Sequence, residues 1–329
     1  MKTLTKILSF GMMILLLFCS FVGCSSVRRI KSTKQEARVV GTCAGYDVRY
    51  EELRYLALTH AAEMKQEYGE DIFVSAEADA YEEELQTRVA RSLCQTYAIL
   101  DICEDAGVKR SAKKTKNEVD EDIEATVAAL GGMEAYEAYL AETYMTDAVN
   151  RLYTAIVSCQ YRYYDEVAFD ELEKEAYDAV LASEGFVRVK SIFVRNDAGE
   201  DVEKNRADAE YVRAEIIGGK PLESFIGSKY NQDLSDCDYY FPKGYMDDAY
   251  EQLAFSLEIG EVGQVLETDE GFYVIQRYAP EEAYFETHME TLIDMYIVGK
   301  MNLSFEAHAG TLSFDKNEYG MSLVLSDIR

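Results

Sequence analysis

Residues 241–278 read FPKGYMDDAYEQLAFSLEIGEVGQVLETDEGFYVIQRY, and this stretch decides the fold of the second half of the chain. Its marks are, in order, Gly244 with Met246, Tyr250, the run Ala254-Phe255-Ser256-Leu257, the run Gly260-Glu261-Val262, and Gly271-Phe272. Five such features in one order over about 30 residues rarely arise by chance. The order, more than any single residue, makes the stretch specific.

The residues upstream extend the pattern. VRVKSIFVRND begins at Val187, a helix-like segment runs to Gly218-Gly219, and LESFIGSKYNQD begins at Leu222. The whole of 187–278 resembles a parvulin-type (PpiC, or rotamase) peptidyl-prolyl isomerase domain. The resemblance implies a small α/β domain with a four-stranded antiparallel sheet, catalysis of rotation about X-Pro bonds, and no cofactor. Such catalysis needs an apolar pocket for the proline ring and a few polar groups in a water-poor site, because uncatalysed rotation is slow.

In the parvulins, two histidines and a cysteine or aspartate form the polar floor of that site. Matched to this sequence, Ser191 takes the place of the first histidine, in the string Ser191–Val194, and Tyr273 takes the place of the second. Asp233, which ends Tyr-Asn-Gln-Asp, matches the aspartate. The resemblance therefore implies Asp233, Ser191 and Tyr273 as the catalytic set, with both histidines replaced. In the alternative interpretation, Asp233 is a loop carboxylate, and Ser191 and Tyr273 are hydrogen-bonded strand residues.

The substrate pocket is implied in the same way. Met246, Tyr250 and Phe255 match the apolar pocket of the parvulins, and Thr268 matches a threonine before the final strand. At helical spacing the first three could equally be ordinary core. The loop 235–241 lacks the glycines usual in this family, which changes its backbone path, and Asp238 stands where the pocket leucine is expected.

The N-terminus has the layout of a secretory signal. Lys2 and Lys6 precede an apolar run of about 16 residues, Ile7–Val22, and Gly23-Cys24 closes it. It resembles a bacterial lipobox, which implies lipidation at Cys24. An uncleaved anchor is the alternative, although the run is shorter than the roughly 20 residues that a spanning helix needs. Removal of residues 1–23 leaves 31 basic and 61 acidic residues, a net charge of −30, which disfavours nucleic acid and anionic lipid headgroups.

Thiols and histidines offer no obvious chemistry. Five cysteines follow Cys24 without a Cys-x-x-Cys spacing; we expect buried free thiols and leave one disulfide open. They are Cys43, Cys94, Cys103, Cys159 and Cys237. The three histidines, at 60, 288 and 308, lie far apart in the sequence, so we expect no metal site. No glycine-rich phosphate loop and no Ser/His/Asp hydrolase motif is present.

The remaining chain is predicted to be mostly helical. A polar tether, 25–36, precedes a short β-rich run, 37–45. After it the sequence predicts a helix over 46–68 and a second over 76–106, which Gly107 stops. A third helix is capped by Ser111 and ended by Gly131-Gly132, a short one covers 133–141, and a long one runs from Thr146 to about Leu181. Residues 281–310 predict a returning helix, and Ser322–Leu325 a strand that pairs near Val39-Val40. The three prolines all follow residue 220, so none interrupts the N-terminal helices.

This layout resembles SurA- and PrsA-type foldases. It implies an α+β fold: a discontinuous helical chaperone domain with the parvulin-like domain inserted into it. The expected divisions are 1–23 (lipoprotein signal peptide), 24–36 (lipidated tether), 37–180 (N-terminal chaperone part), 181–279 (isomerase-like domain) and 280–329 (returning helix and tail).

Three functions follow as hypotheses. The first is an extracytoplasmic foldase, lipid-anchored on the outer face of the cell membrane at Cys24, that acts on unfolded or proline-containing exported polypeptides with weak isomerase activity. The second is a catalytically inactive holdase that binds such chains through its helical domain, for which the tyrosines at 161, 163 and 164 are either a holding surface or helix packing. The third is a tethered binding or adhesion protein. A homodimer is left open, and no nucleic-acid partner is expected.

Overall fold

The computed structural model describes residues 29–196, 201–231 and 237–328. Their contacts divide the chain into two compact units. The helical unit consists of the described residues up to Val167 together with Ser304 onward, and the sheet unit runs from Ala168 to Leu303. Within the described ranges, no helix is long and apolar enough to cross a membrane. The expected class, α+β with a four-stranded antiparallel sheet, is confirmed.

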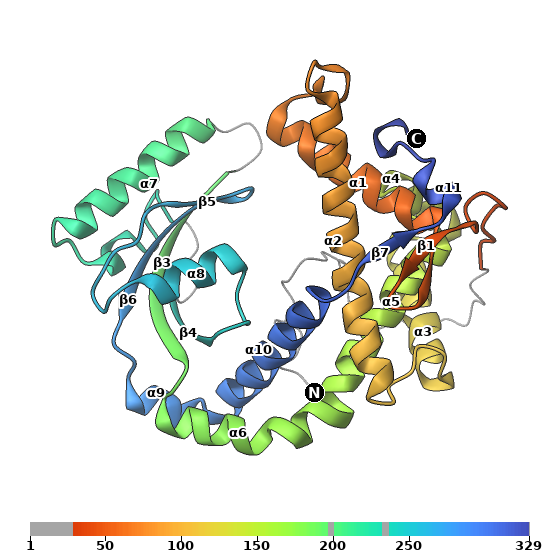
Figure 1. The fold of residues 1–329 in the computed structure, drawn as a ribbon. Helices are drawn as coiled ribbons and strands as arrows, with labels where there is room; N and C mark the ends of the chain where they lie inside the picture. Colours follow the sequence, from red (N-terminus) through yellow and green to blue (C-terminus); the bar gives the residue numbers. More distant parts are fainter. Residues whose placement is uncertain (1–28, 197–200, 232–236, 329) are drawn as a thin grey trace. The chain divides into compact units, whose positions relative to one another are not determined.

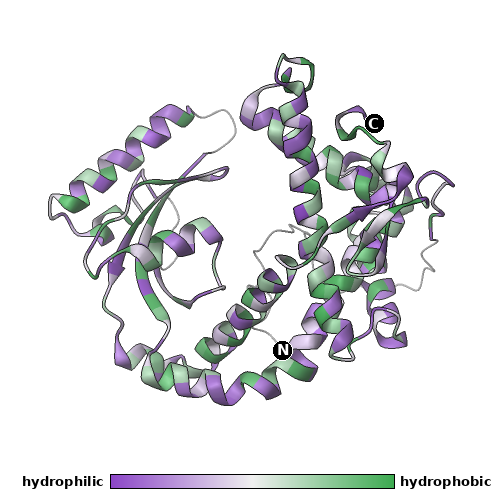
Figure 2. Ribbon diagram, in the orientation of Figure 1, coloured by the Kyte–Doolittle hydropathy of each residue, from purple (hydrophilic) through white to green (hydrophobic). Residues whose placement is uncertain are grey.

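The helical unit is built from five α-helices of the N-terminal half, a small sheet and the C-terminal tail. Its elements are β1 (Val39–Cys43), β2 (Tyr46–Arg49), α1 (Tyr50–Tyr68), η2 (Ile72–Val74), α2 (Ala78–Asp105), α3 (Lys113–Leu130), α4 (Met133–Glu142), α5 (Asp147–Tyr163), β7 (Phe314–Lys316), α11 (Glu318–Met321) and η5 (Leu325–Asp327), with the end of α10 (Met289–Ala309). Figure 2 shows hydrophilic and hydrophobic residues alternating along these helices, as expected where one side packs on a core.

Local signals predicted several helix ends correctly. The Thr146 hydroxyl accepts a hydrogen bond from the Val149 amide and caps α5, and Gly131, at φ 93°, ends α3. Val119, Ile123 and Val127 form the buried face of α3. Two expectations were wrong. Ser111 does not cap α3, which follows Ala112, and the helix expected over Thr146–Leu181 is divided by a π-helical segment, η3 (Tyr164–Ala168), into α5 and α6 (Phe169–Ala182).

The first predicted helix begins later than expected, at Tyr50. Ala44 and Gly45 both have left-handed backbone angles, φ 49° and 77°, which turn the chain so that β2 pairs antiparallel with β1. On the other side of β1, the tail pairs as β7, with Gly41 opposite Lys316. The expected strand at Ser322–Leu325 was therefore wrong: the tail does pair with the N-terminal strand, but through Phe314–Lys316 (Figure 1).

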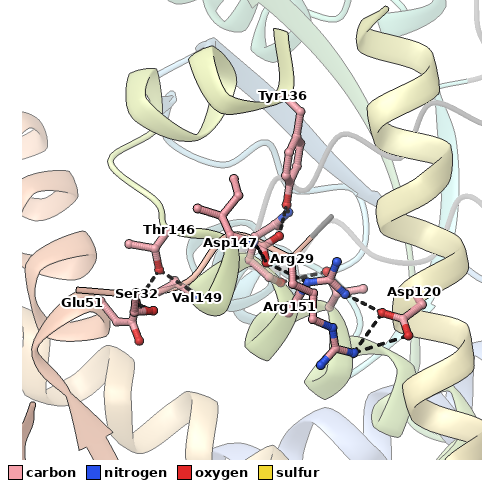
Figure 3. A network of polar contacts seen from close by, with 12 residues as sticks. Arg29, Ser32, Glu51, Asp120, Tyr136, Thr146, Asp147, Val149 and Arg151 are labelled. Carbon is pink, nitrogen blue, oxygen red and sulfur yellow. Dashed lines mark hydrogen bonds and ion pairs between the residues drawn. The ribbon is translucent and has the colours of Figure 1, made fainter. Parts of the chain in front are cut away.

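The chain from Arg29 is bound to the helical unit, whereas we expected a flexible tether through residue 36. Arg29 pairs with Asp120, and the Ile30 amide donates to the Asp147 carboxylate at 3.3 Å (Figure 3). The Ser32 hydroxyl donates to Glu51 at 2.7 Å. Three acidic side chains on α1, α3 and α5 thus hold the segment that precedes β1.

The sheet unit is organised around a four-stranded antiparallel sheet in the order β4-β3-β6-β5, flanked by helices (Figure 1). Its elements are α6, β3 (Phe186–Arg195), α7 (Val202–Ile217), η4 (Leu222–Phe225), β4 (Asp238–Pro242), α8 (Asp248–Ser256), β5 (Leu266–Thr268), β6 (Gly271–Tyr278), α9 (Glu282–Thr287) and the first part of α10. The unit is longer at both ends than the segment 181–279 expected for the isomerase-like domain. Those narrower boundaries stay a prediction.

Successive residues of a strand point to opposite faces, so the sheet has two cores. Ile192 and Val194 of β3 pack with α7, together with Phe272 and Val274 of β6. Val187 and Val189 of β3 pack with α8, together with Ile275. By the same alternation, Ser191 and Tyr273 lie on the α8 face, which is where the sequence places the candidate site.

Candidate functional site

The α8 face brings the two residues that replace the family histidines to one place. Ser191 on β3 is only 5% exposed, and the Tyr250 hydroxyl on α8 donates a hydrogen bond to its Oγ at 3.1 Å. Burial raises the pKa of Tyr250, so its phenol stays neutral and acts as a donor. A hydroxyl that accepts one hydrogen bond can still donate its own hydrogen. Ser191 and Tyr250 therefore form a small, neutral polar pair beneath α8.

Tyr273 completes this cluster with an aromatic contact. Its ring stacks on Phe193 of the neighbouring strand, with centroids 4.3 Å apart and planes 21° apart. It also meets the Tyr250 ring edge-on at 5.3 Å and 83°. Burial raises the pKa of Tyr273 as well. The register that pairs Phe193 with Tyr273 fixes this stack, and Phe193 is a site residue that the sequence analysis did not identify.

The predicted apolar pocket residues lie around the same cluster. Met246 and Phe255 are partly buried against it, and Tyr250 is almost fully buried within it. The Phe255 ring meets Phe241 of β4 edge-on, at 6.1 Å between centroids. The structure thus brings Met246, Tyr250 and Phe255 together with Ser191 and Tyr273. Met246 and Phe255 keep part of their surface exposed to solvent.

Thr268 has a local structural contact. Its hydroxyl donates to the Gly271 carbonyl at 3.0 Å across the turn that joins β5 to β6. Gly271, at φ 149°, has no room for a side chain, because a Cβ would lie 2.2 Å from the Val194 carbonyl oxygen. Thr268 therefore stabilises the hairpin that carries Tyr273.

The altered loop gives one correction. We expected Asp238 in the place of the pocket leucine, but Asp238 accepts two hydrogen bonds from the Arg188 guanidinium, at 2.9 and 2.6 Å, on the other face of the sheet. Tyr239, opposite Val189, takes the α8 face instead, and its phenol contributes to the raised pKa of Tyr250. Asp233 and residues 235–236 lie outside the described residues, as does Cys24.

The histidines and cysteines have ordinary surroundings. His60 contacts Glu63 and Ser92, His288 stacks on Tyr284, and His308 contacts Asp101. Over 29–196, 201–231 and 237–328, no three His, Cys, Asp or Glu side chains gather as a metal site would require. The five described cysteines are buried; Cys43, Cys94, Cys103 and Cys159 are free thiols, and the Cys43 and Cys94 sulfurs lie 3.9 Å apart. Tyr163 packs on Phe305 and Tyr164 is buried, which fits helix packing.

Burial raises the pKa of Tyr250 and of Tyr273, so both phenols stay protonated at neutral pH. The cluster can therefore bind a peptide group and polarise its carbonyl by hydrogen bonding, without exchanging protons with it. Acid–base chemistry is not needed to rotate an amide bond. A hydroxyl donor near the amide and aromatic walls that exclude water are enough to assist that rotation, and this cluster offers both. The same groups are equally suitable for holding a proline or an apolar side chain.

Comparison with known proteins found structural likeness only. No family model matches the chain, and no curated protein sequence matches it. PrsA of Bacillus subtilis is 18% identical, with 84% of this chain and 91% of that chain covered and a TM-score of 0.27. The foldase protein PrsA of Streptococcus pneumoniae is 16% identical, with 67% and 82% covered and a TM-score of 0.36. PrsA of Lactococcus lactis is 13% identical, with 88% and 99% covered and a TM-score of 0.27. TM-scores this low do not establish a common arrangement of the whole chain.

Proposed function

We propose that this protein is an extracytoplasmic foldase that assists exported polypeptides, and that its sheet unit binds proline-containing segments and isomerises them weakly. The observation that carries the proposal is the convergence of Ser191, Tyr250 and Tyr273 on one buried face beside Met246 and Phe255. These are the positions that the resemblance to parvulins implies, and they come from three separate elements.

The chemistry supports weak rather than full activity. The Ser191 hydroxyl can donate to the carbonyl of the rotating amide, and the aromatic rings of Tyr273 and Phe193 keep water away from it. A histidine in each position would instead offer two ring nitrogens. Asp233 would add a carboxylate to this floor.

The inactive holdase remains the second candidate. The residues in the two histidine positions already contact neighbours of their own: Ser191 accepts from Tyr250, and Tyr273 is stacked on Phe193. A site whose polar groups are engaged with each other can bind an apolar side chain without acting on the peptide bond. In this case the helical unit would carry the chaperone activity.

Anchoring and location belong to the same proposal. The signal-like N-terminus supports export and lipidation at Cys24, which would place the protein on the outer face of the cell membrane. Its partners would be unfolded exported chains. Whether two copies associate is left to measurement of the oligomeric state.

A refolding assay tests the proposal. Residues 25–329 would be added to a model protein whose refolding is limited by an X-Pro bond, and the slow rate would be measured against enzyme concentration. We expect a modest acceleration that Met246→Ala and Asp233→Ala each reduce, while Tyr177→Phe, an exposed tyrosine on α6, leaves it unchanged. If wild type accelerates nothing yet suppresses aggregation, the holdase is correct. If both alanine variants keep the full rate, the activity comes from another site.

A further inference from the structure

A cavity in the helical unit lies far along the chain from the candidate site and has no part in it. It has a volume of about 310 Å³, enough for one or two large side chains. Its apolar wall comes from α1, η2, the turn before α5 and the tail, through Leu58, Ala62, Phe73, Tyr144, Leu325 and Ile328. Every one of these residues belongs to the helical unit.

The walls of this groove are held in place by specific contacts. The Glu82 carboxylate accepts hydrogen bonds from the Leu325 and Ser326 amides, at 2.8 and 2.9 Å, and so fixes the tail. Tyr144 has a left-handed backbone, φ 61°, which is costly for a residue with a side chain. The Arg54 guanidinium donates to the Tyr144 carbonyl at 3.1 Å and holds that turn. Hydrogen bonds therefore fix the shape of the groove, and the strained residue, Tyr144, forms part of its wall.

Apolar side chains next to the groove are open to solvent. Val74, which follows Phe73 in η2, is 82% exposed, and Val324, which precedes Leu325, is 49% exposed. Tyr144 itself keeps 38% of its surface exposed. Exposed apolar residues in such a group extend the groove into a surface that can bind another chain.

The charge of the residues around the groove indicates which kind of polypeptide segment it would bind. Glu70 and Lys65 both line the groove, so the charges of the lining itself balance. Residues 63–79, the stretch to which both belong, contain six acidic residues and one lysine, so the surroundings of the groove carry a net negative charge. A segment with lysines or arginines beside an apolar residue would complement this charge. A second copy of this protein would not, because each copy without residues 1–23 carries a net charge of −30.

We propose that this groove binds an extended, basic and apolar segment of an unfolded polypeptide, with one large side chain inserted between Phe73, Tyr144 and Leu325. The inference deepens the proposed function and rests on it, since it assigns client binding to a particular place on the helical unit. It does not require isomerase activity.

The test uses the absence of tryptophan from this chain. A short proline-free peptide with one central tryptophan flanked by lysines would be titrated with residues 25–329, and tryptophan fluorescence anisotropy would report binding of the probe alone. We expect saturable binding that weakens with added salt, and no binding of the same peptide with glutamates in place of lysines.

Three variants locate the site. Tyr144→Gly removes a wall without backbone strain, and Ala62→Phe fills the groove; each should weaken binding roughly tenfold or more. Glu70→Lys, an exposed change, should weaken the lysine peptide and favour the glutamate peptide. Ala125→Phe on the exposed side of α3 is the matched control and should change nothing. Circular dichroism and thermal unfolding would verify that each variant is folded.

The outcomes of these measurements distinguish failure of the groove assignment from failure of the proposed function. Unchanged binding in folded Tyr144→Gly and Ala62→Phe, or equal binding of both peptides, would overturn the groove assignment while leaving the foldase proposal intact. Sedimentation that shows a dimer dissociated by the peptide would assign the groove to self-association instead. If wild type neither speeds proline-limited refolding nor suppresses aggregation, the proposed function itself fails, whatever the peptide does.

Discussion

Replacement of Glu52 by glutamine should stabilise the helical unit at alkaline pH and not at acid pH. Glu52 lies on α1 and is 2% exposed. One carboxylate oxygen accepts a hydrogen bond from the Tyr97 hydroxyl at 2.8 Å, and the other, Oε1, is buried and has no hydrogen-bond partner among the described residues. Burial raises the pKa of Glu52 to about 7; the hydrogen bond from Tyr97 and the charges of Arg110 and Arg49 oppose this, and Glu51 adds to it.

The size of the effect follows from that pKa. The change from the ordinary 4.5 to about 7 corresponds to roughly 3 kcal/mol at about 1.4 kcal/mol per pH unit. The folded state binds the proton more tightly than the unfolded chain, so this group stabilises the fold least at high pH. Ionisation of Glu52 lowers the free energy of unfolding. This loss of stability is absent below about pH 4.5, grows as the pH rises from 4.5 to 7, and is constant above 7.

Glutamine keeps the acceptor for Tyr97 and never ionises. The two hydrogens of its buried amide nitrogen are left without an acceptor, at a cost of about 1 kcal/mol, so the net gain expected at pH 8 is about 2 kcal/mol. Near pH 4.5 the variant should be no more stable than wild type. Urea unfolding of residues 25–329, followed by circular dichroism at both pH values, measures the difference. The exposed Glu83→Gln on α2 is the control and should stay within about 0.5 kcal/mol of wild type at each pH. A Glu52→Gln difference that does not change with pH would refute the reasoning.

Three further predictions concern the lipid anchor, the candidate site of the sheet unit, and which of the two units suppresses aggregation. Cys24→Ser should abolish metabolic lipid labelling and release the protein or leave its precursor unprocessed; mass spectrometry that finds an unmodified mature Cys24 in membrane fractions would contradict this. Histidine at positions 191 and 273 together should raise the rate of proline-limited refolding, and an unchanged rate in a folded double variant would show that the altered loop no longer permits the pocket. Replacement of residues 187–279 by a short Gly/Ser linker should leave a folded protein that still suppresses aggregation of an unfolded client, measured by light scattering, because Phe186 and Phe285 on either side of the replaced segment pack together at 5.5 Å between centroids. Loss of folding would refute the inserted architecture, and folding without suppression would place client binding on the sheet unit.

Local pattern in the sequence was enough for most of the elements. The apolar spacing of Val119, Ile123 and Val127 predicted the buried face of α3, and Thr146 predicted the start of α5, because both signals act within one or two turns of the chain. The resemblance to the parvulins, carried by the ordered features from Gly244 to Phe272, implied the antiparallel sheet and a single candidate site with Ser191, Tyr250 and Tyr273. The alternation of side chains along strands then required Ser191 and Tyr273 to share a face with the residues that pack on α8.

Only the tertiary structure decided the contacts that depend on register and on distant segments. The pairing of β4 with β3 sets Tyr239, not Asp238, on the α8 face, because a shift of one residue reverses every side chain of a strand. The tail pairs through Phe314–Lys316 because Gly41 lets β7 approach; a Cβ there would lie 2.5 Å from the Asp315 carbonyl oxygen. The burial of Glu52 and the groove beside Tyr144 likewise arise where α1 meets elements far away in the chain, and no periodicity within one segment encodes them.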